Sequence, residues 1–389
     1  MTGAPQKSRR WSRATIAAQA AGQTDEATGG VVGAIQPSTT FERDEAYRLP
    51  PSGDIYRRDQ NTTVREAEAV IAALEGGEDA KLYSSGLSAI AALMRAVGPD
   101  ERILVQRGGY YGTGVLADRH EARGGLVVRF DAEDFSSFRR ACAEHRPRLA
   151  IIETPSNPLL AVIPIAEAAE VLHREADGVL AVDSTTATPI VTRPLEHGAD
   201  VVIHSATKAL NGHSDVLAGA LVRGRTRTAL YDEAAAIRAT EGPVLSPFDA
   251  YLLTRGMRTL SVRVAAMNRS ALHIAHFLAA HPKVERVRYP GLADHPGHAV
   301  AARQMEGGFG SLLSFEVKGG AQEALAVAGR LRIVKRATSL GGVESLVEHR
   351  HSIEPASTGV PPALLRLSVG IEAVEDLVAD LSDALAALP

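Results

Sequence analysis

The sequence predicts an α/β protein with a large domain built on a mainly parallel sheet and a smaller C-terminal α+β domain. Short apolar runs alternate with helix-like stretches, these runs are continuous, and the pattern changes after about residue 246. Continuous apolar strands separated by helices are typical of a parallel sheet covered on both faces. A chain of 389 residues is long enough for two domains. We therefore expect an N-terminal arm over residues 1–55, a large domain over 56–246 and a smaller domain over 247–389.

The first predicted helix covers residues 61–77, because apolar residues recur on one face and Gly76 and Gly77 end the pattern. A second helix, GLSAIAALMRAVG, is opened by the turn YSSG. Helical patterns at 135–145 and 166–176 separate later apolar runs. Strands are expected at RILV (102–105), LVVRF (126–130), LAIIE (149–153), VLAVD (179–183), VVIHS (201–205) and AGALV (218–222).

The C-terminal part has a different pattern. A long helical stretch over residues 250–281 is followed by strand-like runs, VERVRYP (284–290) and GSLLSFEV (310–317). The chain then ends in a predicted helix over 374–388. This order indicates an α+β unit and not a continuation of the parallel sheet.

Composition limits the classes of function. A net charge of −4 argues against a nucleic-acid binder, which usually carries a basic surplus. A single cysteine, Cys142, excludes a disulfide or cysteine-metal framework and favours a reducing, cytoplasmic setting. No apolar run approaches the length of a membrane span. Polar residues from Gln19 onward interrupt the N-terminal stretch, so we expect a basic arm leading into a short helix, not a targeting segment.

Polar segments follow three of the predicted strands directly: ETPSNP, DSTTATP and HSATK. In sheets of this kind, ligands bind beyond the carboxyl ends of the strands. A nucleotide-dependent enzyme such as a dehydrogenase would need a GxGxxG turn or a GxxxxGK[ST] loop. Neither pattern occurs, and GGFGSLL, the nearest glycine cluster, lacks the spacing. The sequence therefore disfavours a nucleotide site.

The residues at these strand ends suit pyridoxal 5'-phosphate. Lys208 is an amine able to condense with an aldehyde, and Asp183 is a carboxylate able to pair with a pyridinium nitrogen. The turn before the helix at Gly86 offers backbone N–H groups for a phosphate. Each feature alone is more often structural, since a lone lysine is usually a solvated charge and a strand-end aspartate usually a turn residue. Their combination at one edge of the sheet is what points to the cofactor.

Segments from QPSTTF (36–41) to LLRLSVGIEAVEDLVADL, including YRRDQNTT, YSSGLSAI, YYGT and SLGGVESL, follow one another in order over nearly the whole chain. In this the chain resembles the trans-sulfuration (Cys/Met metabolism) family of pyridoxal-phosphate enzymes. The resemblance implies a type I aminotransferase-like fold with a seven-stranded sheet. It also implies a homotetramer made of active-site-sharing dimers, with the N-terminal arm contacting a neighbouring subunit, small amino acids as substrates, and no metal.

The resemblance also implies roles for individual residues. Lys208 would hold the cofactor and carry protons, and Asp183 would face the pyridine nitrogen. The phosphate would be held by backbone N–H groups and hydroxyls of the same subunit, together with two side chains of a neighbouring one. The own-subunit groups are those of Gly86, Leu87, Ser205 and Thr207, and the neighbouring pair is Tyr56 and Arg58.

Four further roles concern the substrate and the cofactor ring. Asn157 would contact the ring hydroxyl and lie near the substrate, and Arg366 would bind the α-carboxylate with its planar fork. Ser339 lies where the family contacts the same carboxylate. Tyr110, with Tyr111 as the alternative, would stack on the ring and act as acid or base toward the leaving group.

The chain departs from its relatives at three places near the substrate. Thr338 stands where cystathionine-processing relatives typically have glutamate, and Gly112 where dedicated methionine γ-lyases typically have cysteine. The segment His349-Arg350-His351 replaces the usual His-Pro that precedes Met-Thr-His. Its two histidines have no acidic or cysteine partner at ligand spacing, so we do not expect a metal.

These features lead us to expect a carbon–sulfur lyase of the methionine γ-lyase or cystathionine γ-lyase type. It would act by γ-elimination on cystathionine, methionine or homocysteine, giving a thiol, ammonia and a 2-oxo acid. The alternative is γ-replacement, of the cystathionine γ-synthase or O-acylhomoserine sulfhydrylase type, possible also in secondary metabolism; β-elimination comes third. A non-catalytic relative is disfavoured because Lys208, Asp183 and Arg366 are all present.

Overall fold

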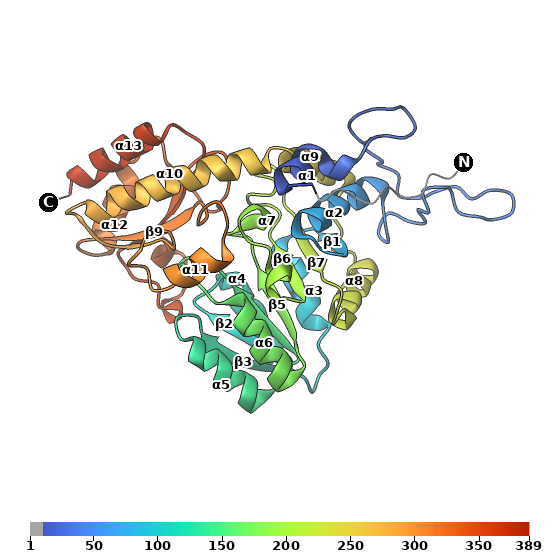
Figure 1. Cartoon of the computed structure of the whole chain (residues 1–389), viewed down its shortest axis with the longest axis horizontal. Helices are drawn as coiled ribbons and strands as arrows, with labels where there is room; N and C mark the ends of the chain where they lie inside the picture. The colour runs from blue at the N-terminus through green and yellow to red at the C-terminus, as the bar shows by residue number, and fades with distance from the viewer. Residues whose placement is uncertain (1–10, 389) are drawn as a thin grey trace.

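The computed structural model describes residues 11–388, which form two sheets with helices packed on them (Figure 1). The basic arm expected before Trp11 lies outside the described residues, and the short helix after it is α1 (Arg13–Ala18). The larger sheet has the order β1-β7-β6-β5-β4-β2-β3 and the smaller one β10-β11-β12-β9-β8. The strands of the larger sheet are β1 (Asp79–Tyr83), β2 (Arg102–Arg107), β3 (Leu126–Asp131), β4 (Leu149–Glu153), β5 (Val179–Asp183), β6 (Val201–His204) and β7 (Gly219–Arg223). Those of the smaller sheet are β8 (Val284–Arg288), β9 (Leu312–Val317), β10 (Lys335–Arg336), β11 (Leu346–Glu348) and β12 (Leu364–Ser368).

The larger sheet confirms the expected mainly parallel, seven-stranded architecture. Only β7 runs against the other strands described, pairing antiparallel with both β1 and β6. The six predicted strands agree with the observed ones to within two residues at each end. The sequence prediction missed β1, because Asp79 and Lys81 interrupt its apolar pattern.

Helices cover both faces of the larger sheet, as continuous apolar strands require. Along β2, Ile103 and Val105 pack with α3, while Leu104 points to the opposite face and packs with α5 and α6. The helices of this part of the chain are α2 (Thr62–Glu75), α3 (Gly86–Arg95), α4 (Tyr111–Glu121), α5 (Phe135–His145), α6 (Ile165–Ala176), α7 (Thr188–Val191) and α8 (Ala229–Glu241), with a 3-10 turn η2 (Pro194–His197). Another 3-10 turn, η1 (Ala20–Gly22), follows α1.

The C-terminal part begins with α9 (Pro247–Met257), which packs against α2 of the larger domain. The long helix α10 (Leu260–Ala280) then runs along the smaller sheet, and α12 (Ala321–Arg330) and α13 (Val374–Ala386) lie with it (Figure 1). The remaining elements are α11 (His298–Gln304) and the 3-10 turns η3 (Arg350–Ser352) and η4 (Ala356–Thr358). The exact domain limits stay a prediction. Among the described residues, no helix is long and apolar enough to span a membrane.

Strand alternation directs polar side chains of the smaller sheet away from its core. In β12, Leu365 and Leu367 join the core shared with α10 and α13, so Arg366 between them points to the other face. Val347 of β11 joins the same core, which turns Glu348 to the face of Arg366. Glu348 and Arg366 are direct partners in the β11–β12 register. The fold therefore brings a charged pair to the face on which the candidate site lies.

Candidate active site

Lys208 lies in the turn that follows β6. Its Nζ donates a hydrogen bond to Ser339 Oγ at 2.9 Å, which links the larger domain to the smaller one. Burial, and then the positive charge of Arg366, lower the pKa of Lys208 to about 8. This lowered pKa gives Lys208 a larger neutral fraction near neutral pH than an exposed lysine has, as a nucleophile or base requires.

Two buried carboxylates end the neighbouring strands β4 and β5, where Glu153 and Asp183 are register partners. Burial raises the pKa of both, and burial together with the nearby charge of Asp183 raises the pKa of Glu153 well above its usual range. The hydrogen bonds that the Asp183 carboxylate accepts from other described residues come from Thr185 and reach Oδ1 only. Its second oxygen is therefore left for a partner such as a protonated ring nitrogen.

Glu153 is a site residue that the sequence interpretation quoted but did not assign. One of its oxygens accepts from the backbone N–H of Tyr110, and the other from the backbone N–H of Asn157 at 2.8 Å. Its role depends on contacts across 43 residues of chain, which no local pattern reveals. Glu153 thus positions two segments that the sequence placed at the cofactor ring.

The N-terminus of α3 forms a close cradle against the turn after β6. Ser85 caps the helix, its Oγ accepting from Ser88 N at 3.1 Å. A Cβ at Gly86 would lie 2.9 Å from the Cβ of Ser205, so only glycine allows this approach. The N–H groups of Gly86 and Leu87 belong to the first turn, where no intrahelical acceptor exists. Such a helix terminus binds a phosphate readily.

The hydroxyls of Ser205 and Thr207, both predicted to hold the phosphate, have different neighbours in the structure. Ser205 lies against Gly86, as expected. Thr207 Oγ1 instead bonds the backbone of Ala218, donating to the oxygen at 3.1 Å and accepting from the nitrogen at 2.9 Å. We refer below to Asp183, Ser205, Thr207 and Lys208 as the strand-end cluster.

Arg366 has a guanidinium held on three sides. Its Nη1 donates to Asn157 Oδ1 at 3.1 Å and its Nη2 to the carbonyl of Ser339 at 2.8 Å. The same Nη2 lies 2.6 Å from Glu348 Oε2. Its Nε is buried without a hydrogen-bond partner among the described residues, and burial lowers the pKa of Arg366 to about 10. A buried donor without a partner suits a carboxylate ligand.

Ser339 joins the two halves of the site in a rare backbone conformation. Its φ of 120° is a region that residues other than glycine seldom adopt. Its hydroxyl accepts from Lys208 and its carbonyl from Arg366. These two contacts hold the residue in the conformation that it adopts.

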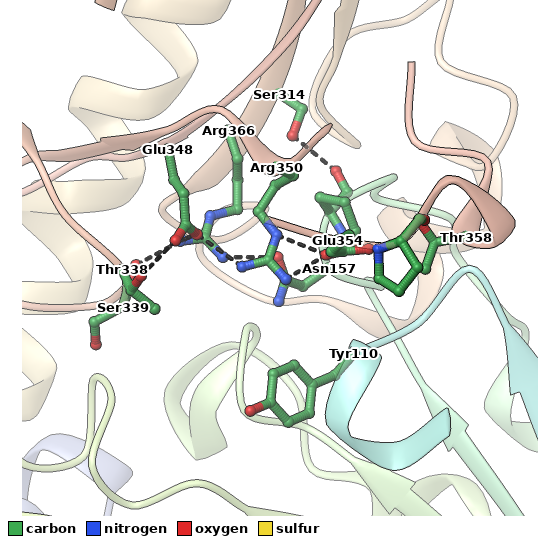
Figure 2. Close-up of polar contacts among 12 residues, drawn as sticks. Tyr110, Asn157, Ser314, Thr338, Ser339, Glu348, Arg350, Glu354, Thr358 and Arg366 are labelled. Atoms are coloured by element: carbon green, nitrogen blue, oxygen red, sulfur yellow. Dashed lines mark hydrogen bonds and ion pairs between the residues drawn. The ribbon is translucent and has the colours of Figure 1, made fainter. Parts of the chain in front are cut away.

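Of the two neighbouring tyrosines, the structure brings Tyr110 to the site, with its ring below the two arginines (Figure 2). Burial raises the pKa of Tyr110, while the nearby charge of Arg350 acts in the opposite direction. A Cβ at Gly112 would come within 2.6 Å of the Tyr110 ring. Gly112 therefore permits this ring position.

The altered segment after β11 contributes charged residues that the sequence interpretation did not assign. Arg350 pairs with Glu348 at 2.8 Å and with Glu354, and Thr338 donates to Glu348 at 2.6 Å (Figure 2). The departure from the relatives was visible in the sequence, but the pairing was not. We call Glu348, Arg350, Glu354 and Arg366 the arginine cluster.

The two histidines of that segment have structural partners. His349 bonds Ser352 and the carbonyl of Pro362, each at 2.6 Å, and His351 bonds the carbonyl of Val360 at 3.1 Å. Within residues 11–388, no group of three or more potential ligands could hold a metal ion.

Tyr56 and Arg58 lie in the extended N-terminal region. The Arg58 guanidinium lies over the Tyr56 ring at 5.3 Å, and its Nε donates to the carbonyl of Ala239 in α8 at 2.7 Å. Tyr56 remains 40% exposed. Their predicted contact with a neighbouring subunit stays a prediction.

Comparisons with known proteins agree with the geometry. The family model described as Cys/Met metabolism PLP-dependent enzyme matches residues 14–386. A cystathionine gamma-synthase of Mycobacterium tuberculosis is 41% identical over 96% of each chain. An L-methionine gamma-lyase of Pseudomonas deceptionensis is 40% identical over 87% of this chain and 86% of that one. A solved cystathionine gamma synthase from Xanthomonas oryzae pv. oryzae, in complex with cystathionine, has a TM-score of 0.91 at 37% identity and covers 97% and 98% of the two chains.

Proposed function

Since the chain belongs to the Cys/Met metabolism family of pyridoxal-phosphate-dependent enzymes, we propose that it breaks the Cγ–sulfur bond of an amino acid such as cystathionine, methionine or homocysteine. The products of this γ-elimination are a thiol, ammonia and a 2-oxo acid. The observation that carries the proposal is the position of Lys208, a partly buried amine with a pKa of about 8, beside Arg366. Tyr110 lies below the same arginine (Figure 2).

The residues present suit the cofactor. The Gly86 cradle leaves room for a phosphate, and the free oxygen of Asp183 suits a protonated ring nitrogen. When bound, pyridoxal 5'-phosphate supplies an aldehyde and a ring that withdraws electrons from substrate Cα. Ser205 and the N–H groups of Gly86 and Leu87 would hold its phosphate, and Thr207 would join them by turning its hydroxyl proton from the carbonyl of Ala218 to the phosphate.

The side chains would divide the work on the substrate. Arg366 binds the α-carboxylate, supported by Asn157 and Ser339. Lys208 removes the Cα proton and then moves a Cβ proton, a role that its lowered pKa permits. Tyr110 gives a proton to the departing sulfur, since a phenol whose pKa is raised by burial holds its proton at neutral pH.

The second candidate is γ-replacement, in which a thiol takes the position of the leaving group at Cγ. It is favoured by the cystathionine gamma-synthase relatives, which match at 41% identity over 96% of the chain. Both reactions would use the same residues for proton transfer. The two candidates therefore differ in what happens at Cγ after the leaving group departs, and not in the residues of the site.

We also propose a cytoplasmic homotetramer in which Tyr56 and Arg58 reach the phosphate of a neighbouring subunit. Two loops of the N-terminal region project from the body of the chain (Figure 1). In this region Val31 is 75% exposed and Tyr47 78%, which is unusual for apolar side chains unless another surface covers them.

The test is a comparison of products. The purified holoenzyme should release a 2-oxo acid from cystathionine, methionine, homocysteine or cysteine. The γ-replacement alternative predicts instead a thioether from an O-acylhomoserine and cysteine, with little 2-oxo acid. Release of no product in either assay would contradict both candidates.

A further inference from the structure

Arg350 brings a second guanidinium to the site. It begins η3 and is only 5% exposed. Figure 2 shows its guanidinium beside that of Arg366, with Tyr110 below both. A buried arginine must be paired to be tolerated, so its partners indicate what it does.

Glu348 is the partner that the two arginines share. Its Oε2 lies 2.6 Å from Arg366 Nη2 and accepts from Arg350 Nη1 at 2.8 Å. Its Oε1 accepts from Thr338 at 2.6 Å. Burial raises the pKa of Glu348, but these donors more than offset that effect and hold it below its usual value. Glu348 is therefore a buried anion with three partners.

Substrate binding disturbs this arrangement. On the proposed function, Arg366 must bind the α-carboxylate, yet in the structure it is paired with Glu348. An incoming carboxylate that binds at the unpartnered Nε shares the single charge of Arg366 with Glu348 and adds a second negative charge beside it. A buried carboxylate whose counterion is shared in this way is destabilised. The site therefore needs another group to hold Glu348 when Arg366 also binds the substrate.

We propose that Arg350 is this group, a positioning residue that keeps Glu348 fully paired while Arg366 also binds the α-carboxylate of the substrate. The proposal rests on the proposed role of Arg366. Thr338 supports it, because its hydroxyl holds the other oxygen of Glu348. Glu354 orients Arg350 by accepting from its Nε at 2.7 Å and from its Nη2. A purely structural alternative is that the Arg350–Glu354 pair only fixes the turn over residues 350–354.

The experiment measures amino-acid binding to the holoenzyme. The probe is L-norleucine, which has an α-carboxylate but no sulfur to eliminate, titrated by the visible absorption of the cofactor. The main variant, Arg350→Met/Glu354→Gln, removes both members of the outer pair, so no charge is left unpaired between them. The matched control, Glu354→Gln, keeps both arginines on Glu348. The rescue variant adds Glu348→Gln to the main variant.

The main variant should raise the Kd for L-norleucine about tenfold or more, the cost of a buried charged group that loses a partner. The control should change it less than about threefold. The rescue variant should return it to within about threefold of the control, because an uncharged glutamine needs no counterion.

Equal Kd values for the main variant and the control would overturn the proposal and leave Arg350 a structural residue. A rescue variant as weak as the main variant would do the same. A wild type that shows no spectral change with L-norleucine would instead contradict the role of Arg366 itself, and the inference with it. Because L-norleucine reports carboxylate binding alone, an error in the assigned reaction does not affect the result.

Discussion

The strand-end cluster of the larger domain and the arginine cluster of the smaller domain meet at Ser339 but are assembled by different means. The strand-end cluster comes from the last residue of β5 and the turn after β6, and most of its hydrogen bonds are to nearby backbone or hydroxyl groups. The arginine cluster is held by ion pairs between side chains of β11, β12 and the segment that begins at η3. The first depends on neutral hydrogen-bonding groups and the second on the pairing of buried charges. The comparison suggests that the first cluster serves the cofactor and the second the substrate.

The largest expected effect is on the strand-end cluster. Lys208→Ala should reduce 2-oxo acid release at least about a thousandfold, because it removes the nucleophile and the proton carrier together. Borohydride should attach the cofactor covalently to Lys208 in the wild type. The purified variant should show no such attachment. Lys318→Ala, an exposed lysine, serves as the control and should behave as wild type. Retained activity in Lys208→Ala would contradict the assignment.

A second substitution on the same side separates cofactor from substrate binding. Gly86→Ala should weaken pyridoxal phosphate binding to the apoprotein about tenfold to a hundredfold, since the new Cβ would lie 2.9 Å from Ser205 Cβ. Gly114→Ala is the matched control, because a Cβ there meets no atom within 4 Å. If both variants bind the cofactor equally well, the α3 cradle does not hold the phosphate.

The arginine cluster should respond in the opposite way. Arg366→Lys keeps the charge but loses the planar fork, so KM should rise about 30-fold to 100-fold while cofactor affinity stays unchanged. Arg330→Lys, on the exposed side of α12, provides the comparison. A parallel loss of cofactor affinity would show that the two clusters do not have separate roles.

These contrasts reflect how much the sequence alone could predict. The strand-end residues follow apolar runs within a few positions, so local pattern and the resemblance located Asp183, Ser205 and Lys208. Glu153 was not assigned, because its function depends on Tyr110 and Asn157 folding over it. Arg366 was expected from the resemblance, but its pairing with Glu348 follows from the antiparallel register of β11 and β12.

The departure at Arg350 shows the same limit. The sequence interpretation singled out the segment His349-Arg350-His351 as a departure and expected no metal at its two histidines. It did not predict that Arg350 would bridge Glu348 and Glu354, since the η3 turn that brings these residues together has no distinct pattern. A charged residue at a position where an uncharged one is expected is therefore a reason to search for its ion-pair partner.

The pH dependence of stability tests the environment of Lys208 without catalysis. Its pKa is about 8 in the folded chain, below the usual lysine value of 10.5, so the unfolded chain binds more protons between these two pH values. The free energy of unfolding of the apoprotein should therefore rise by about 2 kcal/mol from pH 8 to pH 10.5. Lys208→Met should lack this rise, and urea unfolding at several pH values measures the difference. Parallel pH profiles for the two proteins would mean that Lys208 is not buried as described.

The smallest effect concerns Ser339, where the two clusters meet. Ser339→Gly and Ser339→Ala both remove the hydroxyl that accepts from Lys208, so they differ only at the backbone. Alanine is usually the more stable of the two residues because glycine loses more entropy on folding. At a φ of 120° the order should reverse, with the glycine variant more stable by about 1 kcal/mol. Thermal unfolding of the two variants measures this difference. A more stable alanine variant would mean that the backbone at Ser339 stores no strain, and that its rare conformation is not imposed by the contacts with Lys208 and Arg366.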